Sequence, residues 1–319
     1  DLFHLLFQPL QLQSTLATTT LHSNPMTSSL KPLRGLRVLS LALNLPGPAA
    51  LMRLRAMGAK CTKFEPLATD GGSADPMARY RPNAYQQMHR GVRLVSADLK
   101  QASGQKKLHA LLAQTDVLIT SFRPSALKKL GLAPRALHKT YPTLIQVAIV
   151  GAPGALAEEP GHDLTYMAEN GLVNDLALPA SLFADMGGSL LVTETVLQAL
   201  MLRQQRQGLG SHHEVALNAA AAYLGLPRTW GLTTPDGAVG GAHAGYQVYA
   251  CKGGRVAVAA LEPHFARSLC QVAQVPPAVQ AQGMMAPRLH QHLKRWFAGQ
   301  TRAQLNRLAQ RHDIPLHTL

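Results

Sequence analysis

The sequence predicts an α/β protein with two domains, and three observations support that prediction. The chain has 319 residues, enough for two domains at roughly 150 residues each. From Leu33 to about residue 226, short apolar strands alternate with helical stretches, which is typical of a parallel sheet covered by helices on both faces. After residue 245 the pattern changes to a hairpin followed by helices. We therefore expect a Rossmann-like large domain over 26–226, a linker over 227–245 and a small α+β domain over 246–319.

Five strands are expected in the large domain, each a short apolar run bounded by turn or helix signals. They cover 36–41, 60–64, 94–99, 116–120 and 144–149. Helices are expected over 46–57, where Gly58 closes the helix, and over 105–114. A longer apolar helix is expected from Ser189 to about Arg206. Because ligands of such sheets bind outside the carboxyl ends of the strands, we expect the site at that edge. Lys63, Arg93 and Arg123 all fall at or near strand ends, where a phosphate-bearing ligand would meet them.

The small domain is expected to begin with a hairpin of strands 246–251 and 255–260, followed by helices over 265–273, 288–297 and 301–311. Glu262 stands directly after the second strand. Residues 1–25 contain no Arg or Lys, so neither a secretory nor a mitochondrial signal fits them. We expect this segment to be a disordered leader or an artefact of the assumed translation start.

Charge and composition disfavour several classes of function. The net charge of +14 comes from Lys and Arg scattered in ones and twos, with 5% aromatic residues and no nucleic-acid-binding motif, so we expect no nucleic-acid partner. Scattered cations fit a small phosphate-bearing ligand, and a solvated basic surface fits them equally. No apolar run reaches the roughly 20 residues of a membrane span, and the three Cys lack metal-site spacing. We expect a cytoplasmic protein without a metal or a membrane partner. The absence of GxGxxG and Walker A sequences disfavours dinucleotide or ATP binding.

Two titratable clusters, His162 with Asp163 and the single Asp185, stand at the edges of buried structure. Asp185 precedes the expected long helix, whose free N–H groups and positive dipole end favour an ionised carboxylate. A nearby His can hold or release a proton near neutral pH. An acid and a base on either side of a cleft can move a proton at carbon. The simpler alternative is that Asp185 is only a helix cap and His162 a surface or core residue.

A series of short motifs occurs in order along most of the chain, from Leu33 to the end. They are Leu36-Arg37-Val38-Leu39, Pro46-Gly47-Pro48, Arg90-Gly91-Val92-Arg93, Phe122-Arg123-Pro124, Lys129-Leu130-Gly131-Leu132, Gly161-His162-Asp163, Asp185-Met186-Gly187-Gly188, Gly208-Leu209-Gly210 and Tyr246-Gln247-Val248-Tyr249. Together they resemble the family III CoA-transferase superfamily (CaiB/BaiF-like), most closely its α-methylacyl-CoA racemase branch. The resemblance implies a homodimer of two subunits interlocked like links of a chain. Its active sites would lie between the large domain of one subunit and the small domain of the other.

The resemblance also implies the chemistry: an acyl-CoA enzyme with CoA as part of the substrate and no prosthetic group. In the racemase branch, His162 and Asp185 would exchange the α-proton. Glu262 would orient the imidazole, and the backbone N–H of Asp163 would bind the enolate oxygen. In the transferase branch, Asp185 would instead attack the thioester as a nucleophile. The implied CoA contacts are Lys63, Arg93 and Lys129, with Ser121 and Phe122 lining the site.

By the same resemblance, the presence of His162, which the transferase branch usually lacks, favours a racemase or epimerase of 2-methylacyl-CoA thioesters over CoA transfer between carboxylic acids. A CoA-binding homologue without activity is the third possibility, because the chain departs from the family pattern in several places. Val150–Gly154 replaces a glycine-rich stretch, the segment between Gly171 and Asp185 is short, and Ser181 stands where racemases tend to have Asn. The chain also ends at Leu319, where relatives continue, so we expect the small domain to be truncated at its C-terminus.

Overall fold

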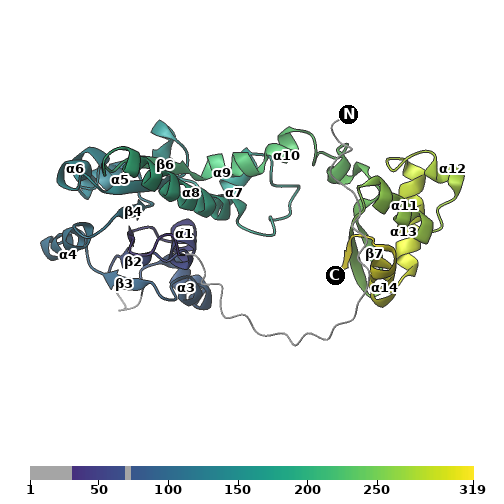
Figure 1. Cartoon of the computed structure of the whole chain (residues 1–319), viewed down its shortest axis with the longest axis horizontal. Helices are drawn as coiled ribbons and strands as arrows, with labels where there is room; N and C mark the ends of the chain where they lie inside the picture. Colours follow the sequence, from purple (N-terminus) through teal and green to yellow (C-terminus); the bar gives the residue numbers. More distant parts are fainter. Residues whose placement is uncertain (1–30, 69–72) are drawn as a thin grey trace, which may run out of the picture.

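The structure, a computed structural model, describes residues 31–68 and 73–319. The leader expected over 1–25 lies outside these residues. Figure 1 shows a large domain built from the first part of the chain and a smaller domain built from the last part.

The large domain contains a six-stranded sheet in which every pairing is parallel, with the order β3-β2-β1-β4-β5-β6. This confirms the predicted Rossmann-like α/β architecture. Five strands agree with the sequence prediction to within a few residues, whereas the sixth, which begins His212-His213-Glu214, was not expected. It is an edge strand with a polar start, so it lacks the apolar run of the buried strands. The bounds are β1 Arg37–Ser40, β2 Lys60–Glu65, β3 Arg93–Ser96, β4 Val117–Thr120, β5 Ile145–Val150 and β6 His212–Ala216.

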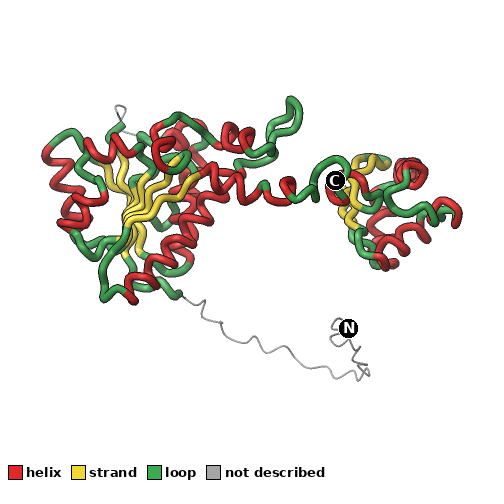
Figure 2. Tube along the Cα trace, turned by 90° about the horizontal axis from the view of Figure 1, so that it is seen from above, coloured by secondary structure: helices red, strands yellow, loops and turns green. Residues whose placement is uncertain are grey.

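Helices cover both faces of this sheet, which runs between them in Figure 2. Successive strand residues point to opposite faces: Val38 belongs to the core cluster under α1, α8 and α9, and Leu39 to the cluster under α4, α5 and α6. This double burial explains why the central strands read as continuous apolar runs. The helix bounds are α1 Pro46–Ala56, α4 Ala102–Leu112, α5 Pro124–Lys129, α6 Pro134–Thr140, α8 Phe183–Gln205 and α9 Leu217–Leu224.

Helix α8 begins at Phe183, six residues before the predicted start at Ser189. Gly187 and Gly188 weakened the helix signal there, because glycine is a poor helix former. Their role is in packing: a Cβ on Gly188 would overlap the Leu217 side chain at the start of α9. The early start places Asp185 inside the first turn of α8, whereas the sequence placed it before the helix.

The small domain has a three-stranded antiparallel sheet in the order β7-β8-β9, with helices packed on one face. Its hairpin, β7 Tyr246–Cys251 and β8 Gly254–Ala259, lies where the sequence predicts one. Strand β9, Leu316–Thr318, was not predicted, because three residues are too few to show a period. Tyr249 stacks on Phe297 in the core with ring centroids 4.6 Å apart. The helices are α11 Pro263–Val272, α12 Pro277–Gln280, α13 Pro287–Gly299 and α14 Arg302–His312.

Between the two domains, the chain runs through α10, Leu226–Thr229, and one further helical turn, Ala238–Ala242. In the described part of the chain, no hydrogen bond or salt bridge joins residues 31–226 to residues 246–319. The described part of the large domain also contains three short α-helices, α2 Pro76–Tyr80, α3 Pro82–Met88 and α7 Asp163–Glu169, and a 3-10 helix, Gly154–Glu158. Among the described helices, none is both long enough and apolar enough to span a bilayer.

Candidate active site

A cavity of about 190 Å³ lies at the carboxyl ends of β1, β4 and β5. Strands β1 and β4 are neighbours in the sheet but not in sequence, so this is the point where strand order reverses and α/β sheets bind ligands. The volume is below the 300–1,000 Å³ or so of pockets that enclose a whole ligand, so it suits the reactive end of a larger one. The residues that line the cavity include Asn44, Ser121, Phe122, Arg123, Gly151, Gly161, His162, Tyr166 and Asp185.

His162 and Asp185, the two predicted proton-transfer residues, both line this cavity. His162 is the exposed residue that caps the start of α7. Thr165 fixes its backbone: the His162 N–H donates to Thr165 Oγ1 at 3.1 Å, and the Thr165 hydroxyl donates to the His162 carbonyl at 2.8 Å. The tertiary structure therefore brings together two residues that are 23 positions apart in the sequence.

Asp163 connects the two helices that carry these residues. Its side chain is buried, and its Oδ1 accepts a hydrogen bond from the backbone N–H of Asp185 at 2.9 Å. Burial, followed by the negative charge of Asp163, raises the pKa of the Asp185 carboxyl to about 6. The sequence led us to expect a carboxylate held ionised by the helix start, but burial outweighs the helix dipole here. A carboxyl that titrates near neutrality can both accept and release a proton.

Ser121 and Phe122 line the cavity as expected, because they directly follow β4 at the carboxyl edge of the sheet. The Ser121 hydroxyl accepts a hydrogen bond from the backbone N–H of Leu43 at 3.3 Å, which joins the β4 loop to the β1 loop. Arg123 also lines the cavity and is exposed. This is the position after a strand at which the sequence predicts contact with a phosphate-bearing ligand, although the family resemblance did not add Arg123 to the CoA contacts.

Lys63 does not take the role that the sequence predicted, because it is not a solvent-facing cation. Its side chain is fully buried in β2 and forms salt bridges with Glu65, at 2.9 Å, and with Asp75. Asp75 in turn accepts hydrogen bonds from the backbone N–H groups of Asn44, at 3.2 Å, and Met77, at 2.9 Å. Lys63 therefore supports the β1 loop from within the domain and has no free access to a ligand phosphate.

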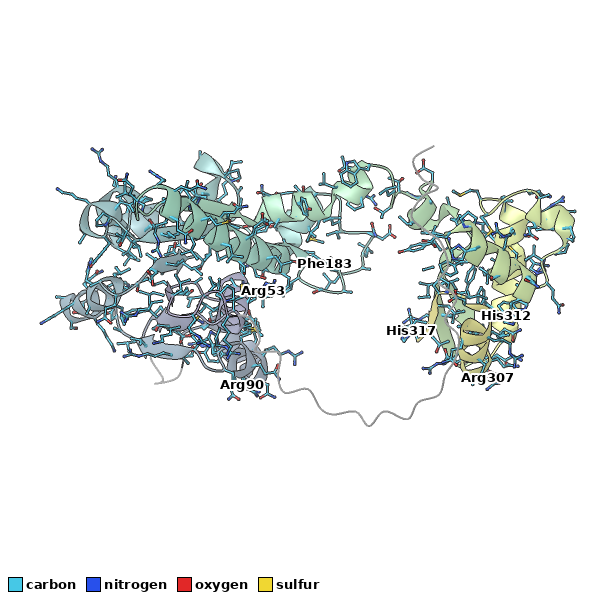
Figure 3. The ribbon with its side chains drawn as sticks, in the orientation of Figure 1. Arg53, Arg90, Phe183, Arg307, His312 and His317 are labelled. Atoms are coloured by element: carbon cyan, nitrogen blue, oxygen red, sulfur yellow. The ribbon has the colours of Figure 1, made fainter. Side chains whose placement is uncertain are left out.

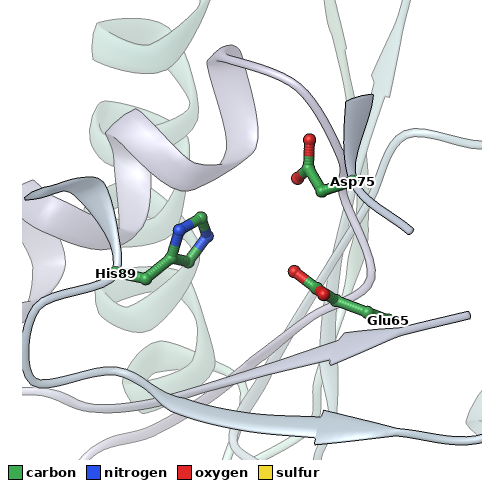
Figure 4. Close-up of side chains that lie close together, drawn as sticks. All are labelled: Glu65, Asp75 and His89. Carbon is green, nitrogen blue, oxygen red and sulfur yellow. The ribbon is translucent and has the colours of Figure 1, made fainter. Parts of the chain in front are cut away.

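Glu65 and Asp75 also lie close to the buried His89, and Figure 4 shows the three side chains grouped around a common space. Such a trio has ligand types that could hold a metal ion. However, the Lys63 ammonium contacts both carboxylates, so a positive charge already occupies the position that a metal cation would take. Burial, followed by the charge of Lys63, lowers the pKa of His89, which keeps its imidazole neutral. We therefore assign this cluster a structural role.

The three other predicted site residues do not line the cavity. Arg93 is the first residue of β3, so it lies toward the amino end of a parallel strand, away from the edge that carries the cavity. Lys129 is exposed at the end of α5. Glu262 precedes α11 in the small domain and is exposed. Of these, the placement predicted for Arg93 is wrong, because the sequence put it at the ligand-binding edge.

A sequence profile of CoA-transferase family III matches residues 33–319. The chain belongs to this family. It is similar to the α-methylacyl-CoA racemase of Homo sapiens, with 30% identity over 251 residues, 73% of this chain and 62% of the relative. It is also similar to the (R)-2-hydroxy-4-methylpentanoate CoA-transferase of Clostridioides difficile, with 30% identity over 207 residues, 60% of this chain and 52% of the relative. The chain thus matches less than two thirds of the length of either relative.

Solved structures show the same fold. A hypothetical protein from Mycobacterium tuberculosis superposes with a TM-score of 0.74 at 24% identity, covering 90% of this chain and 85% of the other. A CAIB/BAIF family protein from Brucella suis also gives 0.74 at 24% identity, covering 90% and 83%. The resemblance inferred from the motifs is thereby confirmed at the level of family and fold.

Proposed function

We propose that the protein is an acyl-CoA enzyme that racemises 2-methylacyl-CoA thioesters. The observation that supports this best is the presence of His162 and Asp185 around one cavity at the ligand-binding edge of the sheet. The similarity to α-methylacyl-CoA racemases, whose name describes this reaction, also supports the proposal. No prosthetic group is needed, because CoA enters as part of the substrate.

In the proposed reaction, either His162 or Asp185 removes the proton from the carbon next to the thioester. The electron pair of the broken C–H bond moves toward the carbonyl oxygen and forms an enolate. The other residue then gives a proton to the opposite face of the same carbon, so one proton leaves and one returns. The backbone N–H of Asp163, at the start of α7, is a donor suited to the enolate oxygen. A pKa of about 6 allows the Asp185 carboxyl to act in both directions near neutral pH.

The cavity has room for the thioester but not for the whole of CoA, so the nucleotide lies outside it in this proposal. Ser121 and Phe122 border the thioester end. Arg123, exposed beside the cavity, and Lys129, at the end of the helix that Arg123 precedes, are the cations we assign to the phosphates.

We further propose that two chains form a homodimer in which the small domain of one chain supplies Glu262 to the cavity of the other. Within one chain, Glu262 does not line the cavity. The β7–β8–β9 sheet lies on the side of the small domain that is turned toward the large domain, where Figure 3 labels His317 of β9. On the large domain, Figure 3 labels Phe183 at the start of α8. Apolar side chains are exposed on both parts: Leu176, Leu178 and Phe183 on one, Tyr246 and Val248 on the other. A second chain would cover such surfaces.

CoA transfer between carboxylic acids is the second candidate, and the position of Asp185 in the lining of the cavity favours it. As a nucleophile, Asp185 would form a bond to the thioester carbon and release CoA as its thiolate. The similarity to a CoA-transferase from Clostridioides difficile is compatible with this reading. The two candidates differ in what they require of His162, which is a proton carrier only in the racemase.

The deciding experiment incubates one enantiomer of a 2-methylacyl-CoA with the protein in deuterium oxide. A racemase incorporates deuterium at the α-carbon and yields the other enantiomer, whereas a transferase moves CoA to an added carboxylic acid. His162→Ala should lower racemisation by roughly 10²-fold or more, typical of a lost general acid or base. Asp185→Ala should abolish either activity. Full retention of activity in His162→Ala contradicts the racemase assignment, and inactivity of the parent in both assays supports an inactive CoA-binding homologue.

The dimer proposal has a separate test by subunit mixing. A dimer of one His162→Ala chain and one Glu262→Gln chain contains one cavity with both defects and one with neither, if Glu262 acts across the interface. Each mixed dimer should therefore have about half of the activity of a parent dimer, so a mixture that has re-paired at random should regain about a quarter of the parent activity. No restoration in mixed dimers confirmed by sedimentation, or a monomeric parent, would exclude the proposed arrangement.

A further inference from the structure

Tyr166 occupies a position in the cavity for which the proton-transfer scheme has no role. It belongs to α7, three residues after Asp163, and its side chain is 6% exposed while lining the cavity. Its hydroxyl lies between Gly151, which follows β5, and Gly161, which precedes His162. A Cβ on either glycine would overlap this oxygen. The two glycines therefore leave room for a phenol oxygen beside His162.

The Tyr166 hydroxyl has no hydrogen-bond partner among residues 31–68 and 73–319. Buried Tyr hydroxyls usually find one. The contrast with Tyr249 is direct, since that hydroxyl donates to the Ala244 carbonyl at 2.6 Å. Burial, followed by the charges of Asp185 and Glu169, raises the pKa of Tyr166, so the phenol keeps its proton. Among the residues that the structure describes, the cavity thus contains a protonated donor without a partner, and a molecule bound in the cavity can accept its hydrogen bond.

We propose that Tyr166 is a further catalytic residue, whose hydroxyl donates a hydrogen bond to the carbonyl oxygen of the bound thioester. This rests on the proposed function only in taking an acyl-CoA as substrate. Negative charge develops on that oxygen when an α-proton is removed, and also when Asp185 attacks the carbonyl carbon. The donor is therefore useful in either reaction. It would act together with the backbone N–H of Asp163, because both belong to the first turns of α7.

Tyr166→Phe tests the proposal, since it removes the hydroxyl and keeps the ring. We expect kcat to fall by about 10²-fold with little change in KM, as for a lost donor to a developing oxyanion. The acid limb of the pH–rate profile, set by Asp185, should stay in place. The control is Tyr223→Phe on α9, where the side chain is 69% exposed and away from the cavity. A Tyr166→Phe variant with a kcat within twofold of the parent would overturn the proposal, as would a shifted acid limb, which would indicate action through Asp185.

Binding gives a readout that does not need turnover. Calorimetry compares acetyl-CoA with S-ethyl-CoA, a thioether that lacks the carbonyl oxygen. We expect the parent to prefer the thioester and Tyr166→Phe to lose that preference while keeping its affinity for the thioether. An unchanged preference in Tyr166→Phe would contradict the proposal even if the protein proves inactive. Loss of the preference in a chain that does not racemise would leave Tyr166 assigned and the racemase excluded.

The position of the hydroxyl can be checked independently through the glycines. A Cβ on Gly151 meets chiefly the Tyr166 oxygen, with the ring carbon Cζ at 3.1 Å, whereas a Cβ on Gly161 meets the ring carbons themselves, at 2.6 Å. Gly151→Ala should therefore be destabilising in the parent and distinctly less so in Tyr166→Phe. Gly161→Ala should be destabilising in both. Equal melting-temperature losses for Gly151→Ala in the two backgrounds would contradict the hydroxyl position on which the proposal depends.

Discussion

The backbone N–H of Asp185 donates a hydrogen bond to the carboxylate of Asp163 at 2.9 Å. Asp163 is the sequence neighbour of the candidate base His162, and through this bond it caps the helix that carries the other candidate base, Asp185. The first N–H groups of a helix lack partners within the helix. In α8, Leu182 provides no side-chain cap, and Asp163 from α7 takes that role for Asp185. The contact fixes the spacing between the starts of α7 and α8, and therefore between His162 and Asp185.

This contact predicts a shift in pH dependence. Asp163→Asn keeps an acceptor oxygen but removes the charge that raises the pKa of the Asp185 carboxyl. If ionised Asp185 is the active form, activity should rise with pH through about 6 in the parent and begin to rise at lower pH in the variant. Most of the elevation should persist, because burial is its larger cause. Rate profiles over pH 4–8 measure the shift, and an acid limb moved upward would contradict it.

A second prediction concerns stability. The pKa of the Asp185 carboxyl rises from 3.8 to about 6 on folding, so between these values the folded state binds more protons than the unfolded state. Stability should therefore fall as pH rises through this window, with the full cost present above pH 6. Asp185→Asn removes this cost and should stabilise the protein at pH 7.5 by about 1–3 kcal/mol.

Thermal unfolding at pH 5 and pH 7.5 checks this prediction. The advantage of Asp185→Asn should shrink at the lower pH, where the parent carboxyl is largely protonated. An advantage of the same size at both pH values would indicate a packing effect unrelated to titration.

Arg123 and Arg93 form a matched pair for CoA binding, since both are exposed and they lie at opposite edges of the sheet. Arg123→Ala should weaken CoA binding by about 1 kcal/mol at low salt, and less at high salt, because an exposed charge pair is screened. Arg93→Ala should leave the affinity unchanged. Calorimetry at two salt concentrations measures both, and an equal loss in the two variants would indicate only a general charge effect.

Lys63 should matter for stability. Lys63→Met keeps the volume but leaves Glu65 and Asp75 buried without their cation, which typically costs about 3–5 kcal/mol. Lys60→Met, an exposed position on the same strand, should change stability by less than about 0.5 kcal/mol. Denaturant unfolding distinguishes the two. A stable Lys63→Met protein with weakened CoA binding would restore the ligand contact that the sequence suggested.

The small-domain hairpin and the first five strands of the large domain could be read from the chain, because each repeats a local pattern. Apolar runs of four to six residues signal strands buried on both faces, as in β4 and β5. Two strands were not predicted, because β6 begins with polar residues and β9 has only three residues. The start of α8 was predicted too late, because the glycines that its packing against Leu217 requires look like a helix boundary in the sequence.

By itself, the sequence determined the family, the α/β fold and the two residues that meet at the cavity. These features could be predicted because short motifs occur along the chain in the order typical of the family. Only the tertiary structure decided which charges are accessible. Lys63 and Arg123 look alike as cations near strand ends, yet one is fully buried between two carboxylates and the other borders the cavity. The hydrogen bond between Asp163 and Asp185 could not be predicted from the sequence either, because the two residues are 22 positions apart and the two helix starts meet only when both helices pack on the sheet. Burial and long-range contacts set the pKa and the access of a charged group, and neither is encoded in its immediate neighbours along the chain.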